Sequence, residues 1–211
     1  MTFTDIVKKH FDYLKSYGFK VTFESNSEVR PQTDGVVEYI PNTIQIVIDS
    51  EIGSASVWFY RIIDGKKFYL TPIDIFEYLQ TNNEEKDLLL SVAPKDQLEA
   101  RALFNRKFLL NQPDWTAATG NSVEKLELSL TNYAKWLIAH ADLCLAGDFS
   151  QWQKFYEYKI LRAKAERLRR GDDELVYTEV QDDQGNWKLI KQSIFKDQLE
   201  HIEKLKKEFP G

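Results

Sequence analysis

Two carboxylates, Asp49 and Glu51, lie one residue apart at the end of an apolar run and form the first arrangement in the chain that could do chemistry. Carboxylates at strand ends hold magnesium in nuclease-like enzymes, where a Glu-x-Lys element accompanies them. The Glu-x-Lys segment of this chain, Glu84 to Lys86, lies in a polar stretch without a strand pattern. The simpler interpretation makes Asp49 and Glu51 turn residues. A metal-dependent hydrolase therefore stays an alternative, and we predict no catalytic set.

His140 and Cys144 are four residues apart in a predicted helix, a spacing that places two metal ligands on one face. Two ligands do not make a site, and a lone cysteine is usually a buried apolar residue. The negative end of the helix dipole would also raise the thiol pKa and disfavour a nucleophile. No glycine-rich phosphate loop is present. We predict neither a metal nor a cofactor.

A basic cluster occupies the end of another predicted helix, where only Glu166 opposes six cations. Glu166 can pair with Arg162 and Arg170 at i±4, which favours a solvated, self-paired helix face. The alternative is a contact with an acidic partner or a phosphate backbone. We take four residues of this cluster as candidate partner-binding residues: Lys159, Arg162, Arg169 and Arg170.

Aromatic side chains dominate the predicted strand 56–63, which contains Trp58-Phe59-Tyr60. Both faces of this strand are apolar or aromatic, as expected for a strand that is covered on both sides. Aromatic residues are also enriched at protein interfaces. Trp58 and Tyr60 are therefore candidate partner-binding residues, with burial in the core as the alternative.

The composition of the chain limits the classes of protein to which it can belong. With 43% hydrophobic residues in 211, the chain can build a substantial core, and its charged residues carry both signs. It lacks an apolar run long enough for a membrane span, and no secretory signal is visible at its beginning. One cysteine fits a reducing compartment. We expect a soluble cytoplasmic protein of unknown oligomeric state that does not embed in a membrane.

Charge is distributed unevenly along the chain. Residues 1–90 carry 14 acidic and 9 basic residues, hence −5, whereas the remaining residues carry 19 of each. The acidic half permits a basic protein partner. Because the chain is acidic and lacks an aromatic RNA-binding strand motif, we do not expect it to bind nucleic acid.

The candidate carboxylates and aromatics belong to a β-rich segment between helices. A helix is predicted over 3–17, capped by Thr2 or Thr4 and ended by Gly18, and a second opens at Thr71-Pro72. Turn residues at Pro41-Asn42 and Asp64-Gly65 separate strands. The predicted strands are 19–24 (with Phe19, Val21 and Phe23 on one face), 36–40, 43–48, 56–63 and 66–70. These elements indicate an α+β fold with an antiparallel sheet of four to five strands flanked by helices.

A mainly helical half follows. We predict helices over 84–91, 95–111 and 194–208, an antiparallel helical hairpin of 122–146 and 151–170, and a second β-hairpin of 173–180 and 186–190. The loop 113–120 is the expected linker. It separates an α+β domain, 1–112, from a domain comprising 121–211, and the alternative is that both pack as one domain.

The order of apolar positions resembles that of small uncharacterised bacterial proteins of immunity-protein type, which protect cells from secreted toxins. The resemblance covers about half of the chain and carries no catalytic signature. The residues concerned are Tyr17-Gly18-Phe19, Val37-Glu38-Tyr39, Ile44-Gln45-Ile46, Phe76 with Leu79, and Leu145 to Phe149. It implies a protein-binding role and transfers no site.

We therefore expect a non-enzymatic, immunity-like protein-binding module. A metal-dependent hydrolase that uses strand-end carboxylates is one alternative. The other is a structural protein that oligomerises through the helices of 122–170.

Overall fold

The computed structural model describes residues 1–40, 44–51, 54–63, 66–109, 122–145, 150–172, 175–181 and 187–208. The predicted turns at Pro41-Asn42 and Asp64-Gly65, the linker 113–120 and most of the Leu145 to Phe149 segment lie outside these residues.

The chain forms two compact units. Unit 1 contains Met1–Glu77 and Leu110–Gln151, and unit 2 contains Tyr78–Leu109 and Trp152–Gly211. These units differ from the expected domains 1–112 and 121–211, because the chain leaves unit 1, builds part of unit 2 and returns. A division at a single linker cannot represent such an exchange of segments.

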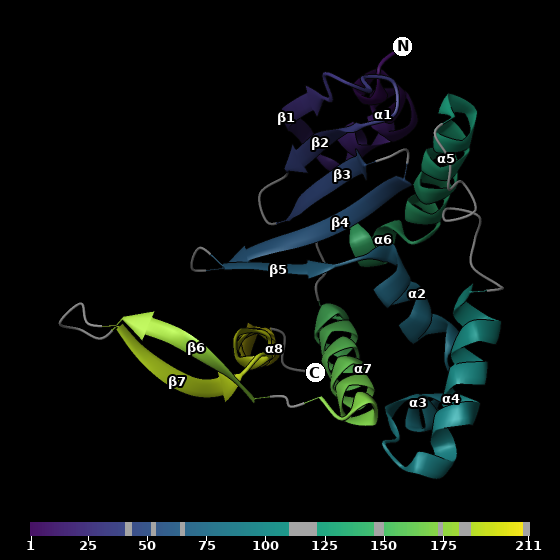
Figure 1. The fold of residues 1–211 in the computed structure, drawn as a ribbon. Coiled ribbons are helices and arrows are strands. Elements are labelled where there is room, and N and C mark those ends of the chain that lie inside the picture. Colours follow the sequence, from purple (N-terminus) through teal and green to yellow (C-terminus); the bar gives the residue numbers. More distant parts are fainter. Residues whose placement is uncertain are drawn as a thin grey trace. The chain divides into compact units, whose positions relative to one another are not determined.

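Unit 1 is built on a five-stranded antiparallel sheet, as the sequence predicts (Figure 1). The strands lie in the sheet in the order in which they occur along the chain, so that each strand pairs with the next. They are β1 (Lys20–Asn26), β2 (Gly35–Ile40), β3 (Gln45–Glu51), β4 (Ser54–Ile63) and β5 (Lys66–Leu70). The α+β class is confirmed.

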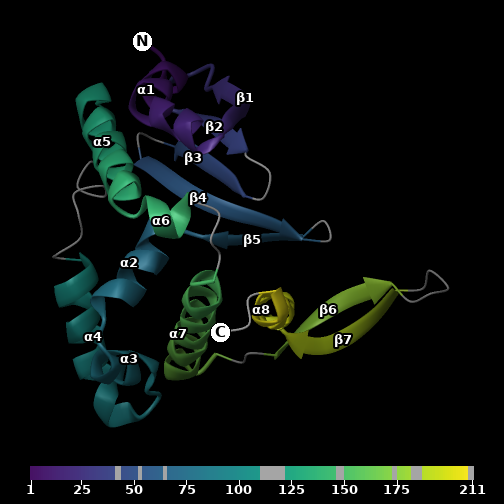
Figure 2. The same cartoon turned by 180° about the vertical axis from the view of Figure 1, so that it is seen from behind.

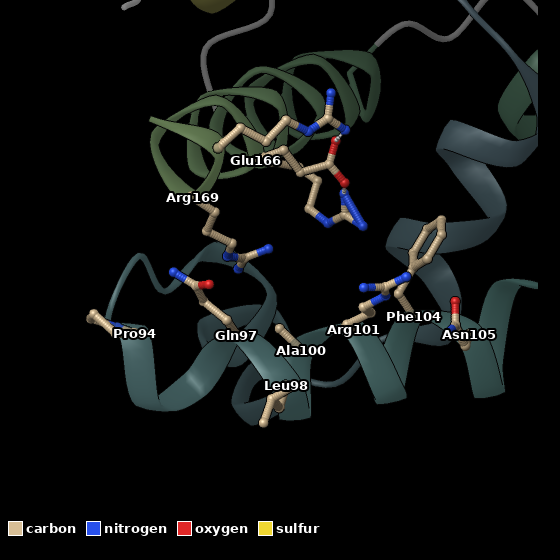
Figure 3. A pocket seen from close by; sticks show the side chains of 11 residues that line it. Pro94, Gln97, Leu98, Ala100, Arg101, Phe104, Asn105, Glu166 and Arg169 are labelled. Atoms are coloured by element: carbon tan, nitrogen blue, oxygen red, sulfur yellow. Dashed lines mark hydrogen bonds and ion pairs between the residues drawn. The ribbon is translucent and has the colours of Figure 1, made fainter. Parts of the chain in front are cut away.

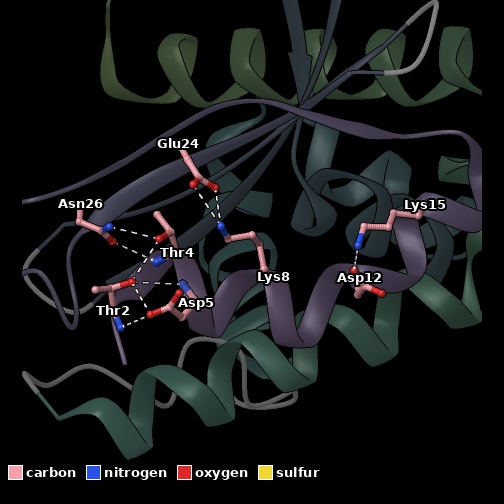
Figure 4. A network of polar contacts seen from close by, with 8 residues as sticks. All are labelled: Thr2, Thr4, Asp5, Lys8, Asp12, Lys15, Glu24 and Asn26. Atoms are coloured by element: carbon pink, nitrogen blue, oxygen red, sulfur yellow. Dashed lines mark hydrogen bonds and ion pairs between the residues drawn. The ribbon is translucent and has the colours of Figure 1, made fainter.

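Helix α1 (Phe3–Phe11) has the predicted cap at Thr2. The Thr2 side chain accepts a hydrogen bond from the Asp5 N–H, and the Asp5 carboxylate accepts one from the Thr2 N–H at 2.8 Å (Figure 4). This reciprocal arrangement satisfies two N–H groups that the first turn leaves unpaired. Because Thr2 also bonds directly to the side chain of Asp5, the helix start is fixed by several contacts.

A 3₁₀ turn, η1 (Asp12–Tyr17), continues α1 and ends at Gly18, whose φ of +83° is left-handed. The Phe19 N–H then donates to the Leu14 carbonyl at 3.1 Å, and both side chains are buried. This is the predicted glycine cap.

Side chains of β1 attach it to α1 (Figure 4). Lys8 pairs with Glu24 at 2.8 Å, and the Asn26 amide exchanges two 3.1 Å hydrogen bonds with the Thr4 N–H and hydroxyl. The amide pair satisfies both polar groups of Asn26 beside the helix start. These contacts fix the helix against the outer strand.

Helix α5 (Val123–Ala139) lies beside α1 on the same side of the sheet (Figures 1 and 2). Glu127 of α5 forms an ion pair with Lys9 and lies 3.3 Å from Nε2 of His10. The core between the helices and the sheet is mainly apolar, and Arg61 and Ser129 are among its buried polar residues. Its apolar side chains include Phe3, Ile6, Val7, Phe11, Ile46, Ile48, Phe59, Leu70, Leu126, Leu130 and Leu137.

The sequence predicts that Phe19, Val21 and Phe23 share the buried face of the first strand, and this prediction is wrong for Val21 and Phe23. Phe19 is buried, but Val21 is 37% and Phe23 50% exposed. The register of β1 against β2 shifts between Val21 and Phe23. Such a bulge inserts an extra residue and sends the following side chains to opposite faces. Simple alternation cannot reveal it.

Unit 2 is mainly helical. It contains the end of α2 (Pro72–Gln80), then α3 (Asn83–Leu90), α4 (Gln97–Phe104), α7 (Trp152–Arg170), α8 (Lys196–Glu208) and the predicted second hairpin, β6 (Leu175–Gln181) with β7 (Trp187–Ser193). Helix α7 packs against α3 and α8.

The two helices of the predicted hairpin, 122–146 and 151–170, belong to different units. Its first helix ends at Ala139, and a short α6 (Ala141–Cys144) follows. Helix α5 packs on α1 and β4 in unit 1, whereas α7 packs with α3 and α8 in unit 2. Both helices have amphipathic faces, and sequence proximity alone suggested that the faces meet each other.

Candidate functional site

The face of the sheet opposite α1 and α5 carries aromatic and aliphatic side chains, and we name it the aromatic face. Antiparallel partners project to the same side of a sheet. The register aligns Phe23, Glu38, Val47 and Trp58 across four strands, and it pairs Tyr60 with Tyr69. The apolar residues of this face are Phe23, Val47, Trp58, Tyr60, Ile62 and Tyr69.

Three aromatic rings of this face form a cluster. The centroids of Trp58 and Tyr69 lie 5.4 Å apart in an edge-on arrangement, while Tyr60 lies 6.5 Å from Trp58 and 6.1 Å from Tyr69. Trp58 and Tyr60 are half-buried, whereas Tyr69 is 43% exposed. Neither predicted residue is therefore hidden in the core. The rings support one another while part of their surface meets solvent.

Hydrogen bonds fix the polar groups around the cluster. The Trp58 indole N–H donates to Oδ1 of Asp49 at 3.1 Å, and the Gln45 amide donates to Oε2 of Glu38 at 2.6 Å. Lys67 Nζ lies 5.3 Å from the Tyr60 ring centroid. Because the indole N–H is satisfied, the tryptophan is held in one orientation.

Burial governs the electrostatics of the aromatic face. It raises the pKa of the Asp49 carboxyl, an effect that the Trp58 hydrogen bond opposes, and it raises the pKa of the Tyr60 hydroxyl. Glu51 follows Asp49 on the same side of β3 and is exposed. With Glu38, which lies between Phe23 and Val47 in the register, these carboxylates make the face acidic, and Lys67 beside Tyr60 is a cation on the same face.

The proposed metal ligands Asp49 and Glu51 do not come together with a third ligand. Within the residues that the structure describes, no group of three or more His, Cys, Asp or Glu side chains is arranged to hold a metal ion. The Asp49 carboxylate serves as the acceptor for Trp58.

Cys144 is buried, and burial raises the pKa of its thiol to about 12. A thiol with this pKa carries almost no thiolate at neutral pH, so the side chain is suited to packing. His140 stands at the junction between α5 and α6, where its ring contacts Trp136 with centroids 4.7 Å apart.

The basic cluster lies in unit 2, and its predicted ion pairs are present. Glu166 contacts Arg162, and it lies 4.0 Å from Arg170. Arg162 is not solvated, however: its side chain is buried, with its guanidinium 4.8 Å from the Phe104 ring centroid. The expectation of a solvated face is wrong for this residue because α4 covers it.

The side chain of Arg169 also makes contacts within the protein. Its guanidinium donates to the backbone carbonyls of Ser91 at 2.9 Å and of Leu88 and Leu89 at the end of α3. Lys159 is half-exposed, and Arg170 is exposed. Of the four candidate cations, Arg162 and Arg169 thus make structural contacts, whereas Lys159 and Arg170 lie nearer the surface.

Sequence analysis missed Tyr69 and Ile62 of the aromatic face and Arg101 beside the basic cluster. The Asp64-Gly65 turn signal with the alternation of β5 could have placed Tyr69 opposite Tyr60. No comparable signal links Arg101 to α7, since their proximity depends on the packing of distant helices.

Helices long and apolar enough to cross a membrane do not occur in the described part of the chain. Comparison with protein-family models, with curated proteins and with solved structures gives no match.

Proposed function

We propose that this chain is a non-enzymatic protein-binding module and that its aromatic face docks onto a basic, partly apolar surface of another protein. The observation that carries the proposal is the cluster of Trp58, Tyr60 and Tyr69 on one face of the sheet, with Tyr69 and the neighbouring Ile62 exposed to 43% and 50%.

Such a cluster suits binding because its geometry exists before a partner arrives. Rings that pack on one another and an indole fixed by Asp49 lose little conformational freedom on docking. Tryptophan and tyrosine are also the residues that most often dominate interface energetics.

Charge identifies the class of partner. The aromatic face contains the carboxylates of Glu38, Asp49 and Glu51, and the first 90 residues carry a net charge of −5. An Arg or Lys side chain of a partner could pair with these carboxylates and stack on the Trp58 ring. The resemblance to immunity-type proteins adds a basic secreted toxin as the partner that fits this chemistry.

The experiment compares three forms of the full chain as bait in lysate from the source organism. These are the wild type, the double variant Trp58→Ala/Tyr69→Ala and the control Ile138→Ala, which removes an exposed side chain from α5. Proteins retained by the wild type are identified, purified and titrated against each form. We expect the double variant to weaken binding by at least about thirtyfold, as for the loss of a central anchor.

The control should bind as the wild type does, and the affinity should fall with added salt. Circular dichroism and urea unfolding would show that all three forms fold. Equal retention by the double variant, or no saturable binding partner of the wild type, would contradict the proposal.

A further inference from the structure

Helices α4 and α7 enclose a groove of about 550 Å³ in unit 2 (Figure 3). Four guanidinium groups line it: Arg101 from α4, and Arg162, Arg169 and Arg170 from α7. Gln97 and Asn105 add amide groups from the α4 side. The volume is that of a pocket for a small ligand.

Positive charge predominates in the lining of this arginine groove. Glu166 is the carboxylate among the lining residues, and it contacts Arg162 and Arg170. Burial and the neighbouring Arg162 lower the pKa of Arg169, while Glu166 and Asp96 act in the opposite direction. Four guanidinium groups thus face one carboxylate in the lining, and an added anion would interact favourably with this excess of positive charge.

Two of the four guanidinium groups, those of Arg162 and Arg169, are held in position before any ligand arrives. The Phe104 ring lies under Arg162, and the carbonyls at the end of α3 hold Arg169. Arg101 is exposed, and among the described residues it has no hydrogen-bond or ion-pair partner (Figure 3). The planar fork of a guanidinium group matches the oxygen geometry of phosphate.

We propose that the arginine groove is a binding site for the phosphate group of a small phosphorylated molecule. Arg101 and Arg170 contact the phosphate from opposite walls, and Arg162 and Arg169 supply the fixed positive potential behind it. Pro94, Leu98, Ala100 and Phe104 form an apolar part of the lining, which accepts the organic body of the ligand. Glu166 occupies the site as an internal anion that limits affinity.

The test titrates the full chain with inorganic phosphate, inorganic sulfate and phenyl phosphate by calorimetry at low salt. Phenyl phosphate should bind more tightly than inorganic phosphate if the apolar wall contributes. Sulfate, a tetrahedral dianion that carries no proton near neutral pH, shows whether the site prefers phosphate or accepts any tetrahedral oxyanion. Arg101→Ala should weaken phenyl phosphate binding about tenfold or more, as for the loss of a charged hydrogen bond.

Arg106→Ala is the matched control. Arg106 is an exposed arginine five residues further on and outside the lining, so its removal changes the total charge equally. It should change the affinity by less than about twofold, the scale expected for a screened distant charge. Glu166→Gln should tighten binding several-fold, because it removes the internal anion.

Three outcomes would overturn the proposal. They are no saturable phosphate binding by the wild type, equal losses in the Arg101 and Arg106 variants, and weaker binding by a folded Glu166→Gln variant. Arg170→Ala provides a second variant of an exposed wall residue, so that the result does not depend on one substitution.

Discussion

Arg169 donates a hydrogen bond through Nε to the backbone carbonyl of Ser91 at 2.9 Å, across 78 residues of sequence. The same guanidinium reaches the carbonyls of Leu88 and Leu89 in the last turn of α3, where the Leu88 carbonyl also accepts a hydrogen bond from the Ser91 N–H at 3.2 Å. A cation at this position also opposes the negative end of the helix dipole. One side chain of α7 thus completes the end of α3 and closes the core of unit 2.

Arg169→Ala should therefore lower the free energy of unfolding by about 2–3 kcal/mol, because it leaves several partly buried carbonyls without their charged donor. Urea unfolding followed by circular dichroism measures the change. Arg170→Ala is the control, since Arg170 is 71% exposed and its ion pair with Glu166 is long at 4.0 Å. That substitution should cost less than about 0.5 kcal/mol, and an equal cost for both variants would contradict the structural role of Arg169.

Gly35 and Gly18 should both resist replacement by alanine, for different reasons. A Cβ at Gly35 would lie 2.5 Å from the Ser25 carbonyl oxygen and 2.8 Å from Phe3, so Gly35→Ala must displace β1 or α1. We expect a loss of about 1–3 kcal/mol from overpacking. A Cβ at Gly18 meets nothing within 4 Å, but its φ is +83°, so Gly18→Ala should cost about 1 kcal/mol through backbone strain.

Asparagine separates these two causes. Asn tolerates the left-handed backbone, so Gly18→Asn should recover part of the stability that Gly18→Ala loses. Gly35→Asn should be at least as harmful as Gly35→Ala, because a larger side chain meets the same backbone oxygen. Thermal unfolding of the four variants provides the measurement. Rescue by asparagine at residue 35 would contradict the steric argument.

Local signals in the sequence identified many of the elements but not their assembly. The Thr2 cap, the Gly18 end of the first helix and the antiparallel order of the strands each depend on neighbouring residues, and the structure confirms them. The division into units was missed because the described residues 122–145, which follow part of unit 2 along the chain, belong to the unit of the sheet. The periodicity of α5 does not indicate whether its apolar face packs against α7 or against the sheet.

The candidate sites show the same limit. The aromatic composition of strand 56–63 was visible, yet the bulge at Val21 and Phe23 that turns Phe23 toward the aromatic face was not. In the basic cluster, i±4 geometry predicted both partners of Glu166. It could not predict that Phe104 and α3 would engage Arg162 and Arg169, since these contacts join helices far apart in sequence.

Cys144 should react with a thiol reagent only when the protein opens. Its side chain is 2% exposed, and burial raises its pKa to about 12, so both access and thiolate formation are suppressed at pH 8. We expect Ellman's reagent to react at least about a hundredfold more slowly with the native protein than with the urea-unfolded chain. Because the chain has one cysteine, the signal reports this position alone. Rapid reaction under native conditions would contradict its burial.

Asp49→Asn should increase stability at neutral pH and remove part of its pH dependence. Burial raises the pKa of Asp49 in the folded state above its value in the unfolded chain, so folding favours the protonated form. The stability contributed by Asp49 is therefore greatest below the unfolded-state pKa, about 3.9 for aspartate, and falls as the pH rises through the folded-state pKa. The Trp58 hydrogen bond opposes this shift without reversing it. Asparagine keeps an oxygen acceptor for the indole N–H and carries no charge.

Urea unfolding of the wild type and of Asp49→Asn at a series of pH values from 3.5 to 7 tests this prediction. The advantage of the variant should be smallest at the acid end and grow with pH. Glu51→Gln is the control: Glu51 is exposed two residues further along the same strand, so its removal should shift stability by less than about 0.5 kcal/mol throughout. A constant difference between Asp49→Asn and the wild type would show that Asp49 is not desolvated, and the aromatic cluster would then be more open to water than its ring contacts imply.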